Sequence, residues 1–295
     1  MSMMISVTRI IGVCYRVNRG KIMEINLSKE IMEELFLQYL AKIFGFPEVV
    51  SCCAKEVVIT RETLVDAGKQ AFEAGYHDLY SDIDLSVKVR LPKNGSVTPE
   101  EYNKRIDRFG VTEDTALGWM YIPVNHIYRI IFKNGMRYDL IFEFEYSDDV
   151  ELNLEKQPSC EDENPNWPVD NINRFWFIQI QALGKLYRRD YLISSHLANM
   201  NCNDALVMQM IMRDLKYGTS HHRYGYSEEL EYVKHLGQAP YRTDDATFNM
   251  ISDRLYSAAL AYDKLVKEFY PCYKDRSSDF FAIWDWYESC RVNLV

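Results

Sequence analysis

The chain has 295 residues, which is enough for one large or two modest domains. Hydrophobic residues make up 47% and charged residues 26% of the sequence, so the composition excludes a disordered chain and is typical of a globular protein. The formal net charge is −9, whereas a protein whose main partner is nucleic acid usually carries a basic face. The charge therefore argues against nucleic acid as the partner and favours a cationic small molecule.

The cysteines show no CxxC or Cys/His ligand spacing, which predicts reduced thiols and a cytoplasmic location. No run approaches the roughly 20 apolar residues that are needed to cross a bilayer, so no membrane partner is expected. Residues 1–22 are basic, and Arg9 interrupts their apolar part, unlike in a signal peptide. We interpret these residues as an N-terminal extension that is disordered or precedes a native start at Met23.

The N-terminal half mixes helical and strand patterns. Ser28 is placed to cap a helix that ends near Phe44. Strict alternation predicts a half-buried strand over Asp82–Val87, and Asn134-Gly135 is a hairpin signal. The other predicted elements are strand-like segments at Val57–Thr60 and Thr63–Val65, a glycine-containing turn region from Ala67 to Gly75, a helix from the Thr98 capping box to Phe109, and hairpin strands at Ile127–Phe132 and Met136–Phe144.

An acidic segment, Glu145–Glu163, is followed by a change to helical periodicity from Asn171 onward. The segment is predicted to be a loop or linker. The expected helices are Arg174–Arg189, Tyr191–Met200, Asp204–Tyr217, Ser227–Leu236, Asp244–Tyr270 and Ser278–Arg291. The predicted fold class is therefore α+β, with a mixed-sheet domain at residues 23–168 and an all-helical C-terminal domain at residues 169–295.

Three aspartates form a pattern that is typical of a magnesium-binding catalytic site. Residues two apart in a strand share a face, so Asp82 and Asp84 are expected to point the same way. Two adjacent carboxylates repel unless a cation lies between them, and Mg²⁺ takes one or two carboxylates together with water and substrate phosphates. Asp139, in a second strand-like run, is expected to complete the site as a third ligand or to accept a proton as general base, and the sequence leaves these two roles open.

Gly68-Lys69, a spacer, Asp82-Ile83-Asp84 and the distant Asp139 resemble the pattern of the polymerase β nucleotidyltransferase superfamily. In the helical half, the segments 173–176 and 184–192 are similar to the C-terminal domain of bacterial aminoglycoside adenylyltransferases of the streptomycin 6-adenylyltransferase type. The likeness spans most of residues 27–270. One departure is that Lys69 stands where the family has a serine that contacts the phosphates.

The resemblance implies a nucleotidyltransferase fold and transfer of a nucleoside monophosphate, from ATP or another nucleoside triphosphate, to a hydroxyl of a small acceptor. It implies that Asp82, Asp84 and Asp139 are catalytic and hold Mg²⁺. It further implies that Gly68, Lys69 and Lys185 bind the nucleotide. An aminoglycoside antibiotic is the expected acceptor, and the acidic Glu145–Glu163 segment could attract such a polycation, although a solvated linker explains it more simply.

Two alternatives remain open at the level of sequence. One is a nucleotidyltransferase that modifies a protein or tRNA in a toxin or defence system. The other is a non-catalytic nucleotide-binding protein in which Lys69 marks a lapsed site. The polar loop His221-His222-Arg223 is interpreted as surface after a helix end rather than a metal site, because adjacent histidines seldom chelate one ion.

Overall fold

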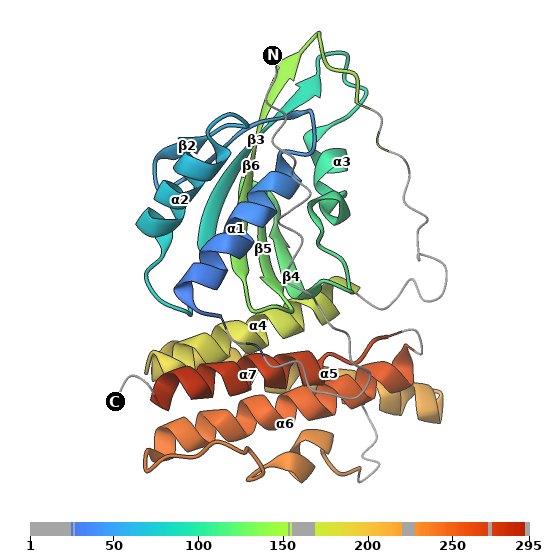
Figure 1. Ribbon diagram of the computed structural model, residues 1–295. Coiled ribbons are helices and arrows are strands. Elements are labelled where there is room, and N and C mark those ends of the chain that lie inside the picture. Colours follow the sequence, from blue (N-terminus) through green and yellow to red (C-terminus); the bar gives the residue numbers. More distant parts are fainter. Residues whose placement is uncertain are drawn as a thin grey trace.

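The computed structural model describes Ile25, residues 27–152, Leu154, and residues 169–219, 228–270 and 273–292. A mixed β-sheet with flanking helices forms one half of the molecule, and helices from the C-terminal part of the chain pack beneath it (Figure 1). The chain is therefore α+β, as predicted. In the described part of the chain, no helix is both long and apolar enough to cross a membrane.

The sheet has six strands in the order β2-β1-β3-β6-β5-β4. Their bounds are β1 Val49–Ala54, β2 Val57–Ile59, β3 Ile83–Pro92, β4 Ala116–Ile122, β5 Ile127–Phe132 and β6 Arg137–Ser147. The central pair, β3 and β6, is parallel, and all other neighbours are antiparallel. The strands predicted around residues 82–87, 127–132 and 136–144 are confirmed, whereas β1 and β4 were not predicted.

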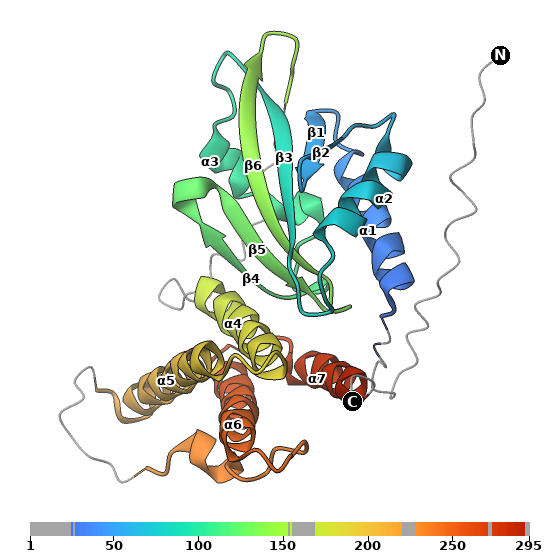
Figure 2. The same ribbon diagram turned by 90° about the vertical axis from the view of Figure 1, so that its left-hand side faces the viewer.

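One face of the central strands is covered by α1 (Lys29–Ile43) and α2 (Leu64–Gly75), as Figure 2 shows. Ser28 caps α1 by accepting a hydrogen bond from the backbone N–H of Ile31, as its sequence position predicted. On β3 the apolar side chains alternate into this core, and the other face carries Asp84, Ser86 and Lys88. The alternation that predicted the strand therefore separates a buried apolar face from a polar face.

The stretch between β2 and β3 differs from its prediction. Thr63–Val65 was expected to be strand-like and Ala67–Gly75 a turn, but α2 begins at Leu64 and continues to Gly75. The buried residues of α2 lie at helical spacing, and two of them are glycines, Gly68 and Gly75. Glycines read as turn signals are here part of a helix, because burial of its apolar face outweighs their low helix propensity.

The remaining helices are α3 (Pro99–Asn103), α4 (Val169–Tyr187), α5 (Tyr191–Tyr217), α6 (Ala246–Phe269) and α7 (Ser277–Val292). The Thr98 capping box with Pro99 at the first helical position is present, but α3 ends at Asn103 and a separate 3₁₀ turn follows at Ile106–Phe109. The helices predicted at 191–200 and 204–217 are one continuous helix, since no glycine or proline interrupts them. The helix expected at Ser227–Leu236 is a 3₁₀ segment at Glu231–His235, with Ser227 outside the described residues.

Gly118 of β4 marks a close approach between the sheet and α4. A Cβ atom at this position would lie 2.5 Å from the carbonyl oxygen of Asn173 and 2.6 Å from the backbone nitrogen of Phe177. These are backbone atoms of a helix, which cannot move aside as a flexible side chain can. The strand and the helix therefore pack directly, backbone to backbone.

Replacing Gly118 with alanine is expected to lower the free energy of unfolding by about 1–3 kcal/mol, because the added methyl group pushes α4 from the sheet. Urea denaturation followed by far-UV circular dichroism measures the change. Gly75→Ala is the matched control, since its Cβ would meet only the Lys55 side chain at 3.5 Å and no loss is expected. Equal stability of Gly118→Ala and the wild type would contradict this packing.

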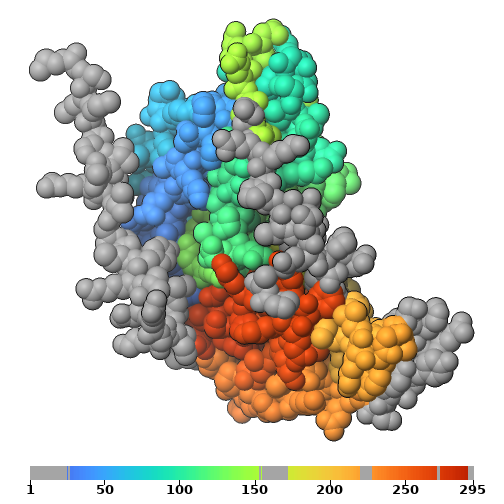
Figure 3. Space-filling model, turned by 90° about the vertical axis from the view of Figure 1, so that its right-hand side faces the viewer, coloured from blue at the N-terminus to red at the C-terminus, as the bar shows by residue number. Residues whose placement is uncertain are grey.

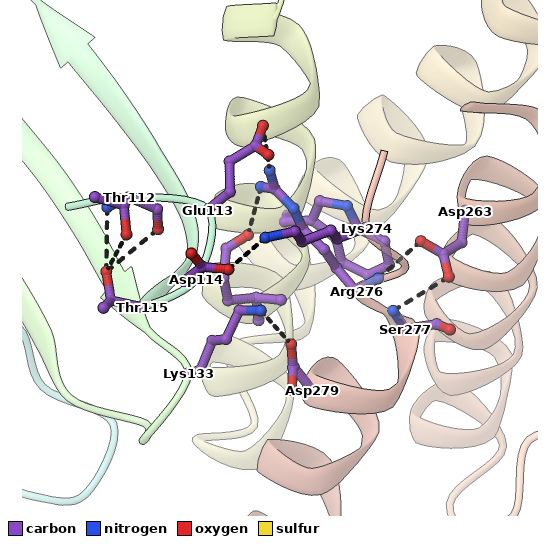
Figure 4. Close-up of polar contacts among 12 residues, drawn as sticks. Thr112, Glu113, Asp114, Thr115, Lys133, Asp263, Lys274, Arg276, Ser277 and Asp279 are labelled. Carbon is purple, nitrogen blue, oxygen red and sulfur yellow. Dashed lines mark hydrogen bonds and ion pairs between the residues drawn. The ribbon is translucent and has the colours of Figure 1, made fainter. Parts of the chain in front are cut away.

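Polar contacts join the two halves as well. Lys274 Nζ lies 2.5 Å from Asp114 Oδ1, and Lys133 Nζ lies 2.9 Å from Asp279 Oδ2. Figure 4 shows both pairs near the buried Arg276, and in the space-filling view the red C-terminal part of the chain lies against the blue and green sheet half (Figure 3). The two halves therefore form one continuous structure.

Candidate functional site

Asp82, Asp84 and Asp139 are brought together by the parallel pairing of β3 with β6. Asp84 and Asp139 are direct partners in the register, and Asp82 immediately precedes β3. Burial is the main cause that raises the pKa of Asp139, and the negative charges of Asp82 and then Asp84 raise it further. The carboxylates are thus close enough to repel one another, as the sequence pattern predicted for this group.

Asp139 is the most buried of the three, with 7% of its surface exposed. Arg129 is its cross-strand partner on β5, and its Nε and Nη2 atoms approach the same carboxylate oxygen, Oδ2, at 2.9 and 2.8 Å. Among the described residues Oδ1 has no hydrogen-bond partner, although it is buried. Burial outweighs the attraction of Arg129 and raises the pKa of the carboxyl to about 6. A buried, unpartnered carboxylate oxygen is costly, and such groups cluster at functional sites.

Asp82 forms an ion pair with Arg137, whose Nε lies 2.7 Å from Oδ1. The Arg137 side chain is buried where the two halves meet, and its Nη1 donates to the carbonyl oxygen of Tyr80 at 3.1 Å. Gly184 of α4 allows this approach, since a Cβ there would lie 3.1 Å from Nη1. The buried Tyr287 of α7 interacts with the same guanidinium. The position of Asp82 therefore depends on the C-terminal helices.

Asp84 is half-exposed, and its Oδ2 atom lies 3.4 Å from the amine of Lys55. Lys55 and Glu56 form the two-residue turn between β1 and β2, and both have positive φ angles, 47° and 67°. This is the backbone of a tight hairpin turn that usually contains asparagine or glycine. Lys55 was not identified from the sequence, because a Lys-Glu pair carries none of the usual signals for such a turn.

The predicted phosphate-binding turn at Gly68-Lys69 is wrong. Gly68 is buried in the middle of α2, where its missing side chain makes room for Leu37 and Leu40 of α1. Lys69 is exposed on the same helix, and its amine lies 4.0 Å from Glu33 of α1. Neither residue presents a loop backbone to a phosphate, since the N–H groups of a helix interior are already bonded within the helix. Neither is part of the function proposed below.

The remaining predicted residues are placed as follows. Lys185 lies in the last turn of α4, partly exposed, with its amine 3.6 Å from Asp190. Its nucleotide contact stays a prediction. The expected acidic loop begins instead within β6, where Glu145 pairs with Lys88 and Arg90, and residues 155–163 lie outside the described part of the chain. His221, His222 and Arg223 also lie outside it.

The carboxylates suit a magnesium ion that is shared with a substrate. Among the described residues, no three Asp, Glu, His or Cys side chains are grouped so as to hold a metal ion by themselves. Magnesium, however, usually needs only one or two carboxylates and completes its shell with water and phosphate oxygens. Asp84 with its exposed carboxylate meets that requirement, and Asp82 lies beside it. These two residues would hold the ion. Oδ1 of Asp139, which has no hydrogen-bond partner among the described residues, would face the ion or a substrate hydroxyl.

A cavity of about 680 Å³ lies elsewhere, lined by residues of α3, β4 and α4 that include Asn103, Trp119, Tyr121 and Arg174. None of the three aspartates lines it. A large cavity is ordinarily the first candidate for a ligand site. Here we give more weight to the aspartates, because they place like charges side by side and because burial and these charges raise the pKa of Asp139 to about 6.

The sequence matches no protein-family profile and no curated protein sequence. The likeness to nucleotidyltransferases therefore rests on the aspartates and the helical segments described above.

Proposed function

We propose that the chain is a magnesium-dependent nucleotidyltransferase that transfers a nucleoside monophosphate, AMP from ATP, to a hydroxyl of a small cationic molecule such as an aminoglycoside. The observation that carries the proposal is the pairing of Asp84 with Asp139 on adjacent parallel strands, together with one buried carboxylate oxygen of Asp139 that has no hydrogen-bond partner in the described part of the chain. The resemblance to nucleotidyltransferases supports the reaction class, and the net charge of −9 supports a cationic acceptor.

The reaction forms a bond between the acceptor oxygen and the α-phosphorus and breaks the bond from that phosphorus to the bridging oxygen, so that pyrophosphate leaves with the electron pair. Magnesium, when bound, neutralises charge on the phosphates. Asp84, with Asp82 beside it, would hold the ion, and keeping the reactants in line in this way supplies most of the rate enhancement in such reactions. Asp139 accepts the proton of the acceptor hydroxyl, which assigns to it the role of general base.

The acceptor and the nucleotide are tested together by incubating the protein with ATP, MgCl₂ and a panel of aminoglycosides that includes streptomycin. Pyrophosphate release and the mass of an AMP adduct are measured. Asp84→Asn is the control, because its carboxylate is exposed and the substitution should leave the fold intact. Release that depends on both acceptor and Asp84 supports the proposal, and no release with any cationic acceptor contradicts it.

One observation favours a second candidate, a non-catalytic nucleotide-binding protein. Each aspartate is paired with a different basic side chain, Arg137, Lys55 and Arg129, so the charge of the group is balanced without a metal ion. Titration calorimetry with ATP, in the presence and absence of Mg²⁺, separates the two candidates. Binding that requires Mg²⁺ and Asp84 supports the transferase, whereas binding independent of Mg²⁺ supports the second candidate.

A further inference from the structure

The turn between β1 and β2 presents Lys55 at the same end of the sheet as the three aspartates. Its place is fixed by the hairpin, since Ala54 pairs with Val57 and only Lys55 and Glu56 lie between them. The strand β1 is in turn paired with β3, which carries Asp84. The backbone of Lys55 is therefore held in place by the hairpin, while its long side chain can move the ammonium group between partners.

The three ion pairs at the site differ in how firmly they are held. The arginines lie within 2.9 Å of Asp82 and Asp139, and at least one partner of each pair is largely buried. The pair between Lys55 and Asp84 is longer, at 3.4 Å, and its side chains are 41% and 52% exposed. Exposed ion pairs contribute little to stability, so this pair exchanges most readily with another cation.

We propose that Lys55 is the residue that contacts the triphosphate, and that it holds the carboxylate of Asp84 only until magnesium takes its place. The inference rests on the proposed function and names a ligand for the phosphate chain that the sequence had assigned to Lys69. A divalent ion at Asp84 repels the neighbouring ammonium group. Phosphate oxygens of a nucleotide bound with that ion would offer the displaced amine an anionic partner.

Lys69 supplies the matched control. It is also an exposed lysine that forms one weak ion pair, with Glu33, but it projects from α2 toward α1 instead of from the turn beside Asp84. A substitution at either lysine removes the same charge from the protein. A difference between them therefore reports on position and not on net charge.

The experiment compares the wild type with Lys55→Met and Lys69→Met in two titrations. In the first, Mn²⁺ alone is added as a spectroscopic substitute for Mg²⁺, and free Mn²⁺ is followed by electron paramagnetic resonance. In the second, inorganic tripolyphosphate is added in the presence of Mg²⁺ and followed by calorimetry. Lys55→Met is expected to bind Mn²⁺ about 3–10-fold more tightly, because a competing cation is gone, and tripolyphosphate about 10-fold more weakly.

Lys69→Met is expected to match the wild type within about twofold in both titrations, since it lies outside the site. Lys55→Arg, which keeps the charge, should retain tripolyphosphate binding. Unchanged circular dichroism confirms that the variants are folded.

The inference is overturned if Lys55→Met and the wild type agree in both titrations, or if loss of Lys55 weakens Mn²⁺ binding. In these cases, binding of Mn²⁺ and tripolyphosphate by the wild type would still support the proposed transferase. If the wild type binds neither Mn²⁺ nor tripolyphosphate with Mg²⁺, the proposed function and this inference fail together.

Discussion

The Asp139→Asn variant is expected to lose nucleotidyl transfer by about 10²–10⁴-fold, because an amide cannot accept the acceptor's proton. The same variant is expected to be more stable than the wild type at pH 7.5. Burial and the neighbouring aspartates make the ionised carboxylate unfavourable even beside Arg129, and they raise its pKa from 3.8 to about 6. A shift of this size corresponds to about 1–3 kcal/mol of free energy of unfolding that the amide recovers.

The stability difference between Asp139→Asn and the wild type is expected to depend on pH. Because the pKa of Asp139 is higher in the folded than in the unfolded protein, the folded state binds more protons between about pH 4 and pH 6. Wild-type stability therefore falls as the pH rises through that window and stays lower above it. The advantage of Asp139→Asn should be about one third of its full size near pH 4.5 and full at pH 7.5.

Urea denaturation at the two pH values, alongside the pyrophosphate assay, measures both effects. Glu143→Gln is a suitable control, since Glu143 is exposed on the same strand and the substitution should alter neither quantity. A variant that kept its activity would remove Asp139 from the reaction. One that was less stable than the wild type at pH 7.5 would show that the pair with Arg129 outweighs burial.

The Arg276→Met variant is expected to lose about 3–5 kcal/mol of free energy of unfolding. Arg276 is 1% exposed, and its Nη1 donates to the carbonyl oxygen of Leu117 at 2.9 Å and to Asn173 Oδ1 at 2.7 Å. Its Nη2 lies 3.5 Å from Glu113 Oε1. Removing the guanidinium leaves buried acceptors from β4 and α4 without a donor, and each such acceptor is costly.

Lys274→Met is the control for this prediction. Lys274 also joins the two halves, through Asp114, but both side chains are exposed, so a loss below about 1 kcal/mol is expected. Urea denaturation of both variants measures the difference. A loss of less than about 1 kcal/mol for Arg276→Met would show that the halves are held together mainly by apolar packing.

The elements that were predicted correctly are those whose sequence pattern is local. The alternation over 82–87 and the hairpin signal at 134–135 require only neighbouring residues, and the three strands β3, β5 and β6 formed where expected. Strand β1 was missed because its burial does not alternate regularly, and its cysteines and serine carry little strand signal. Helix α2 was misjudged because Gly68 serves contact with a helix distant in sequence, which no local pattern reveals.

The same distinction applies to the site. Asp82 and Asp84 could be predicted as neighbours because the two-residue period of a strand decides which side chains share a face, and the resemblance to nucleotidyltransferases added Asp139. Their basic partners could not, since the pairing of Arg129 with Asp139 requires the register of β5 on β6. The place of Arg137 depends on its contact with α4, and the place of Lys55 depends on the pairing of β1 with β3. Both contacts join residues that are distant in sequence.

Because Arg137 is buried against α4, neither half positions the candidate site alone. Cut away from Gly184 and Tyr287, the guanidinium would be hydrated and free to swing, and Asp82 would lose its fixed neighbour. A chimaera with helices from another protein would keep Asp82 in place only if a glycine or a similar gap in the new helix left room for Arg137. The C-terminal helices therefore help to position the candidate site, although none of the three aspartates belongs to them.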